Sequence, residues 1–147
     1  MRKQPASEST GELILLSVSP DSEDHVSLQA IVCHSKWKMF SARDLSSALA
    51  LLQQHEISVL LCERDLLPGT WIDLMKHITI LQNAPSVIVT SQRADHRLWA
   101  EALNLGAWEV LTKPLKRTEV IHSVQTAWRH WHNQIHLRPA MMIPAAS

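Results

Sequence analysis

Residues 57–69 read ISVLLCERDLLPG, an apolar run that ends at charged residues and a turn. A short run rich in Ile, Val and Leu is typical of a strand that is covered on both faces, as in a parallel sheet. Open α/β sheets bind their ligands beyond the carboxyl ends of such strands. Glu63 is the first charged residue after the run. Its position makes Glu63 the first candidate for a functional side chain.

Further apolar runs before and after this one are also predicted to be strands. They lie at residues 12–18, 36–41, 85–91 and 108–112. Helix-start signals, apolar spacing and a terminal Gly106 predict helices between and after them. Their expected ranges are 20–34, 43–55, 70–82, 95–105 and 117–137. Five strands that alternate with five helices predict an α/β protein, a three-layer sandwich around a five-stranded parallel sheet.

The first and third of these helices have the clearest start signals. Ser19 is expected to cap the first, with Pro20 in its first turn. Thr70 and Asp73 have the spacing of a capping box at the third. We expect one domain over residues 11–137, a disordered start at 1–10 and a flexible tail at 138–147.

Composition excludes several classes of function. The 147 residues include 14 basic and 14 acidic residues, so no net charge attracts the chain to nucleic acid or to a membrane surface. The longest apolar runs are too short to span a bilayer. Cys33 and Cys62 lie in apolar segments without CxxC spacing. They are predicted to be buried free thiols, which places the chain in the cytoplasm.

Three motifs in the second half of the chain give the most specific signal. They are VIVTS at residues 87–91, ALNLGA at 102–107 and VLTKPL at 110–115. In order and spacing they resemble the receiver domain of bacterial response regulators, and the likeness extends over about residues 12–130. The resemblance implies a flavodoxin-like sheet of strand order 2-1-3-4-5 and a cis peptide bond at Lys113-Pro114.

The same resemblance implies a site at the carboxyl edge of the sheet. In the family an Asp at the end of the third strand accepts a phosphoryl group, and an acidic pair after the first strand holds Mg²⁺. The positions of the phosphoryl-binding hydroxyl and lysine are occupied here by Thr90 and Lys113.

The chain departs from this pattern at the residues that carry the chemistry. Glu63 stands in the acceptor position, because the apolar run ends at Cys62; counting back from Pro68 would select Arg64 instead. Ser17 and Val18 replace the acidic pair. Mg²⁺ is usually held through one or two carboxylates, so we expect the family's Mg²⁺ to be lost and no other metal to replace it. Asp21 and Asp24 are predicted to interact favourably with the dipole at the start of the first helix.

Glu63 and Lys113 are therefore predicted to form an ion pair, for which two interpretations stay open. The pair could be purely structural, or Glu63 could imitate the phosphorylated state. Both interpretations make the chain a non-catalytic, phosphorylation-independent pseudo-receiver. The alternative is a genuine phosphorelay regulator that a histidine kinase phosphorylates. Val110 stands where receivers carry a mobile aromatic side chain, and a β-branched residue has few rotamers.

The last helix carries an apolar stripe with spacing 3, 4, 3, 4. Its residues are Ile121, Val124, Trp128, Trp131 and Ile135. The last three are predicted to extend beyond the sheet as an exposed apolar patch. Together with Trp99 on the preceding helix, they are the predicted interaction face for a protein partner or a second copy of the chain.

Overall fold

A computed structural model describes residues 12–66 and 69–146, with side chains described as far as Ile135. The disordered start predicted for residues 1–10 lies outside the described residues. Five parallel strands form one sheet in the order β2-β1-β3-β4-β5, which confirms the predicted fold. The strands are β1 Ile14–Val18, β2 Lys38–Ala42, β3 Val59–Glu63, β4 Ser86–Ser91 and β5 Glu109–Thr112.

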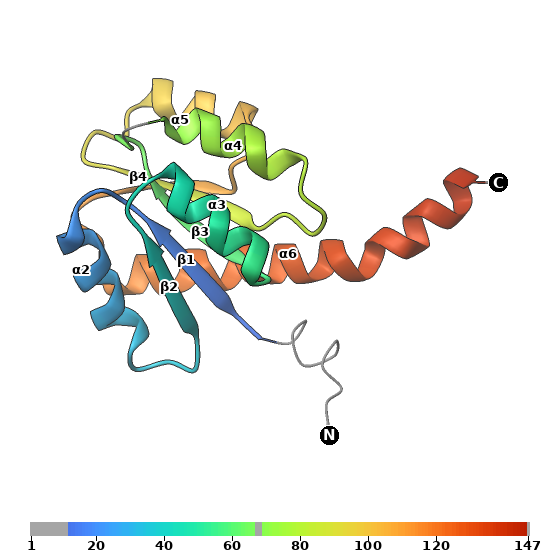
Figure 1. Cartoon of the computed structure of the whole chain (residues 1–147), viewed down its shortest axis with the longest axis horizontal. Coiled ribbons are helices and arrows are strands. Elements are labelled where there is room, and N and C mark those ends of the chain that lie inside the picture. Colours follow the sequence, from blue (N-terminus) through green and yellow to red (C-terminus); the bar gives the residue numbers. More distant parts are fainter. Residues whose placement is uncertain (1–11, 67–68, 147) are drawn as a thin grey trace.

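Helices cover both faces of this sheet, as Figure 1 shows. They are α2 Ser22–Val32, α3 Leu45–Gln54, α4 Trp71–Thr79, α5 His96–Asn104 and α6 Arg117–Ala146. Apolar side chains of α3, α4 and α5 pack on one face of the strands, and those of α2 and α6 pack on the other. The central strands β1, β3 and β4 are buried along their whole length, as their sequences predict.

The helix-start signals are confirmed at α4 and corrected at α2. Thr70 and Asp73 form the expected capping box. Helix α2 begins two residues later than predicted, because its N-cap is Asp21 and not Ser19. The Ser19 hydroxyl instead accepts a hydrogen bond from Asp21 N and donates one to Asp24. Gly106 has a φ of 99°, the left-handed conformation expected just after a helix end.

The last helix differs most from the prediction. It extends to Ala146 and so includes most of the residues expected to be a flexible tail. Trp131 is only 1% exposed, so its place in an exposed patch is wrong. Its indole N–H donates to the carbonyl oxygen of Asn83 at 3.3 Å. The loop before β4 therefore reaches α6, and Trp131 belongs to the interior. Trp128 and Ile135 are half-buried.

One of the two thiols is also placed differently from the prediction. Cys62 is buried in β3, but Cys33 is exposed. Cys33 is the C-cap of α2, beyond the last turn that packs on the sheet. The buried side of α2 is formed by Leu28, Ile31 and Val32, and Cys33 does not belong to it.

Candidate functional site at the carboxyl edge of the sheet

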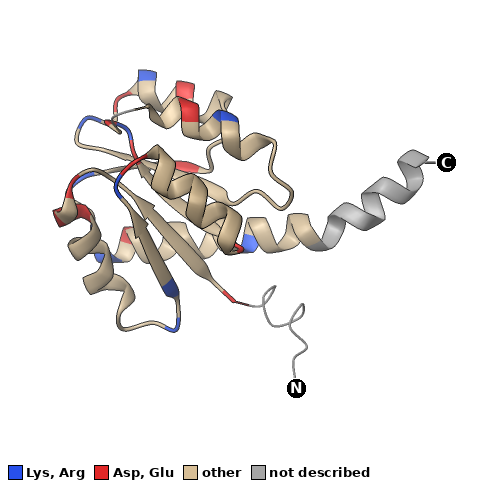
Figure 2. Ribbon diagram, viewed as in Figure 1, with Lys and Arg blue, Asp and Glu red and all other residues tan. Residues whose placement is uncertain are grey.

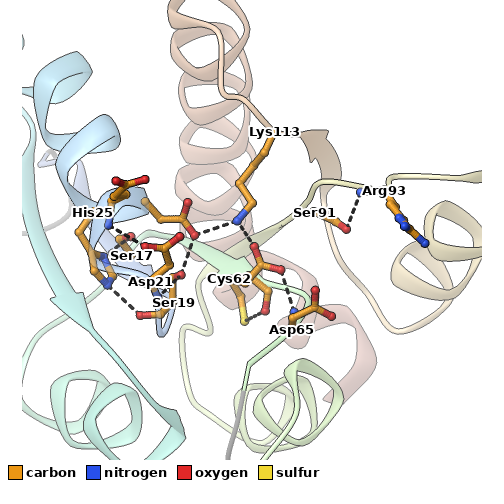
Figure 3. A network of polar contacts seen from close by, with 12 residues as sticks. Ser17, Ser19, Asp21, His25, Cys62, Asp65, Ser91, Arg93 and Lys113 are labelled. Carbon is orange, nitrogen blue, oxygen red and sulfur yellow. Dashed lines mark hydrogen bonds and ion pairs between the residues drawn. The ribbon is translucent and has the colours of Figure 1, made fainter.

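Glu63 is the last residue of β3, and its side chain lies among the strand ends. It is 5% exposed although it is charged. Its carboxylate forms an ion pair with the ammonium group of Lys113, which follows β5 (Figure 3). The other carboxylate oxygen accepts a hydrogen bond from Asp65 N at 2.8 Å. Both oxygens of Glu63 are thus held by the protein.

Lys113 has a second acidic partner that the sequence interpretation missed. Its Nζ lies 2.9 Å from Asp24 Oδ2. The same oxygen accepts a hydrogen bond from the Ser19 hydroxyl at 2.6 Å. We call Asp24, Lys113 and Glu63 the ionic triad. Asp24 lies in the first turn of α2, and α2 begins just after β1 reaches the carboxyl edge of the sheet. This position along the chain is the sequence signal that could have placed Asp24 near Lys113.

The surroundings fix the charge state of Lys113. Burial alone would lower the pKa of Lys113, but hydrogen bonds and charges from Asp24 and Glu63 outweigh this effect and raise its pKa. Lys113 is therefore fully charged at neutral pH. Burial, and to a smaller degree the charge of Glu63, raise the pKa of the neighbouring Cys62 thiol. Cys62 consequently remains a neutral thiol without nucleophilic character.

Ser17 and Val18 do not extend this acidic cluster. Ser17 is buried, and its hydroxyl shares a hydrogen bond of 2.8 Å with His25 Nδ1, while His25 Nε2 contacts the Ser19 carbonyl at 2.9 Å. Val18 is 1% exposed and belongs to the core under α3 and α4. Within the described residues, no group of three or more His, Cys, Asp or Glu side chains is placed to hold a metal ion.

Thr90 lies beside Glu63 in the sheet, but its hydroxyl does not join the triad. The two residues are partners in the β3–β4 register, and the Thr90 carbonyl accepts a hydrogen bond from Arg64 N at 2.8 Å. The Arg64 side chain turns outward and pairs with Asp65 at 3.6 Å. Glu63, and not Arg64, therefore faces Lys113 at the strand ends. Val110, which stands where the resemblance implies a mobile aromatic side chain, is buried.

The triad remains accessible from solvent on one side. Asp24 and Lys113 border a cavity of about 410 Å³ between the start of α2 and the loops after β4 and β5. A small reagent can therefore reach the edge of the triad. The Lys113-Pro114 peptide bond beside it is cis, as the resemblance implies.

A strand-end pocket of this kind on a 2-1-3-4-5 sheet is the arrangement of receiver domains, and comparison with known families agrees. The sequence model of the protein family described as the response regulator receiver domain matches residues 21–125. The chain belongs to this family of signal-transduction domains, which are generally non-enzymatic.

Solved structures of receivers share the fold. The signal receiver domain of an HD domain-containing protein from Pseudomonas fluorescens Pf-5 has a TM-score of 0.78 at 23% identity, over 85% of this chain and 93% of that one. The receiver domain of a putative LuxO repressor protein from Vibrio parahaemolyticus has a TM-score of 0.80 at 15% identity, over 86% and 97%. Chemotaxis response regulator CheY4 of Vibrio cholerae has a TM-score of 0.72 at 16% identity, over 79% and 98%. At these identities the likeness shows the fold alone.

A search for curated relatives and a search for membrane-spanning helices both give negative results. A search of curated proteins finds no significant match. In the described part of the chain, no helix combines the length and apolarity needed to cross a membrane.

Proposed function

We propose that this chain is a pseudo-receiver that transmits signals through protein contacts, without phosphorylation, Mg²⁺ or catalysis. The observation that carries the proposal is the position of Lys113 Nζ between the carboxylates of Asp24 and Glu63. In this arrangement an ammonium group offsets one of the two carboxylate charges beside the strand ends, in the place where a divalent cation would otherwise be held.

The available oxygen ligands also fit Mg²⁺ poorly. Mg²⁺ requires near-octahedral oxygen coordination with at least one well-placed carboxylate. Val18 offers no ligand, and the Ser17 hydroxyl is bonded to His25. The carboxylates of Asp24 and Glu63 already bind Lys113, and that of Asp21 accepts a hydrogen bond from Glu23 N as the cap of α2. A metal ion bound by Asp24 or Glu63 would have to displace the ammonium group from that carboxylate.

Glu63 also resembles a phosphorylated acceptor in one respect. It presents a negative charge to Lys113 permanently, whereas a phosphoryl group of about −1.5 to −2 charge does so only after transfer. The backbone of Lys113 is fixed as well, because Lys113 N donates to the Ser91 carbonyl at 2.9 Å. This arrangement supports a domain with a single signalling state, and it accommodates both a structural and a mimetic role for Glu63.

Incubation with acetyl phosphate, or with beryllofluoride and Mg²⁺, tests the first part of the proposal. We expect no increase in mass and no shift in amide NMR resonances, because no acceptor Asp stands at the end of β3 and Lys113 is already paired. A receiver that retains its acidic pair and its acceptor Asp serves as the positive control. The 410 Å³ cavity borders Asp24 and Lys113, so these reagents can reach the edge of the triad. A Mg²⁺-dependent phosphoryl adduct would support the alternative, a regulator phosphorylated by a histidine kinase.

The contact surface is proposed to lie on α5, the start of β5 and the adjoining side of α6. Trp99 and Leu103 are 43% and 41% exposed and lie four residues apart on α5, so they share one side of the helix. Trp108 is partly exposed, and its ring stacks on His130 of α6 at 4.6 Å. These residues form an apolar surface suited to a partner or to a second copy. The half-buried Trp128 does not join this surface, because its indole N–H donates to the Glu12 carbonyl on the other side of α6. Ile135 lies seven residues after Trp128, on that same side of α6. The free thiols support a cytoplasmic location.

Light scattering during size-exclusion chromatography tests this surface. We expect a dimer for the wild type and a monomer for Trp99→Glu/Leu103→Glu, because two charges would be buried in the interface. Val26→Glu is the matched control, since Val26 is 69% exposed on α2, which packs on the opposite face of the sheet. A wild-type protein that stays monomeric up to about 1 mM, a concentration above the dissociation constants of ordinary dimers, would rule out the homodimer.

A further inference from the structure

A second concave site lies at the amino end of the sheet, at the opposite end of the strands from the ionic triad. It is a groove of about 590 Å³ between the residues before β1, the loop before β2 and the middle of α6. This volume falls within the usual range for small-molecule sites. We call it the amino-end groove. Neither the receiver family match nor the triad assigns it a role.

Two tryptophans give the amino-end groove its apolar walls. Trp37 and Trp128 are half-buried, and both pack against the core under α2 and α6. The Trp128 indole N–H donates to the Glu12 carbonyl at 3.3 Å, and its ring stacks on His132 with 4.8 Å between centroids. These contacts hold the Trp128 ring in place. The groove therefore presents a preorganised aromatic surface.

The charged side chains of the amino-end groove leave a positive excess. Glu12 lines the groove, but its carboxylate pairs with Lys38 at 3.5 Å. Lys36 and Arg129 also line it and are exposed. Among the described residues, neither has an acidic partner within ion-pair distance. Figure 2 shows basic residues at the start of β2 and in the loop before it.

We propose that the amino-end groove binds a small, flat aromatic anion, such as an aryl carboxylate or aryl phosphate. The ring would pack on the indoles of Trp37 and Trp128, where aromatic pairs add to the burial of apolar area. The anionic group would lie between Lys36 and Arg129, whose N–H groups form charge-assisted hydrogen bonds with oxygen anions. A cationic ligand would meet repulsion, and a neutral ring would leave both cations unpaired. The inference is independent of the proposed pseudo-receiver function, because it uses none of the residues of the triad.

NMR titration of the ¹⁵N-labelled full chain with naphthalene-2-carboxylate tests the proposal. The six tryptophans give separate indole N–H signals, which Trp37→Phe and Trp128→Phe assign. We expect saturable shifts for Trp37 and Trp128, and none for Trp71 and Trp99 on the other face. Lys36→Glu/Arg129→Glu should weaken binding by about tenfold or more, because two attractions become repulsions.

The control variant is Lys76→Glu, which changes an exposed lysine on α4, away from the groove. It should bind like the wild type. Circular dichroism verifies that each variant is folded, which is expected because all three basic residues are exposed. Absence of shifts up to about 5 mM ligand, a limit weaker than ordinary small-molecule affinities, would overturn the proposal. Equal binding of the neutral naphthalene-2-methanol, or undiminished binding by the double variant, would overturn it as well.

Discussion

Lys113→Met is expected to destabilise the domain by about 3 kcal/mol, because it leaves two largely buried carboxylates without a cation. The side chains of Glu63 and Asp24 are only 6% and 18% exposed. Without Lys113, water can compensate neither charge fully, and the two acids also repel each other. Urea unfolding at pH 7 measures the loss as a lower midpoint with an unchanged slope.

The pH for this measurement follows from the direction of the Lys113 shift. Folding raises the pKa of Lys113, so its contribution to stability is complete below the unfolded value of about 10.4 and is lost as the pH rises through the folded value. At pH 7 the contribution is fully present. The wild type and Lys113→Met should become more alike in stability in strongly alkaline solution, where Lys113 loses its charge.

Two further variants separate the charge effect from loss of packing. Lys38→Ala breaks the exposed pair with Glu12, whose side chains are 63% and 40% exposed, and should change stability by less than about 1 kcal/mol. Glu63→Gln in the Lys113→Met background should restore part of the lost stability, since it removes one of the uncompensated charges. If Lys113→Met is as stable as the wild type, the triad is not a structural element of the fold.

Trp131→Ala is expected to lower stability by about 3–5 kcal/mol, the usual loss when a buried aromatic side chain is truncated. Trp131 is 1% exposed, and its indole N–H is bonded to the Asn83 carbonyl. The substitution leaves a cavity under α6 and an unpaired carbonyl in the loop before β4. Thermal unfolding followed by circular dichroism, combined with urea titration, gives the size of the effect.

Trp99→Ala is the matched control, because it removes the same side chain from a position that is 43% exposed. Its effect on monomer stability should stay below about 1 kcal/mol. Trp131→Phe should be intermediate, since it keeps most of the apolar volume but loses the hydrogen bond. A small effect of Trp131→Ala would mean that α6 does not pack against the loop before β4 in solution.

The arrangement of the sheet could be predicted from the sequence because its signals are local. The apolar run 57–62 indicates a strand covered on both faces whatever its neighbours are. The Thr70–Asp73 box and Gly106 mark helix ends through hydrogen bonds and backbone conformation within a few residues. The alternation of five strands and helices then permits few topologies. The convergence of Glu63 and Lys113 follows from that topology, since parallel strands end at one edge.

The partners of individual side chains were decided only by the tertiary structure. From the sequence, Asp24 is predicted to interact with the helix dipole. It belongs to the triad only because Lys113, 89 residues later in the chain, approaches it in the folded structure. The apolar stripe on α6 shows which residues share a side of the helix. It does not show how far along the helix other segments of the chain cover that side. Trp131 is buried because the loop before β4 reaches it. Periodicity records the direction of a side chain, whereas burial and charge pairing depend on segments far away in the chain.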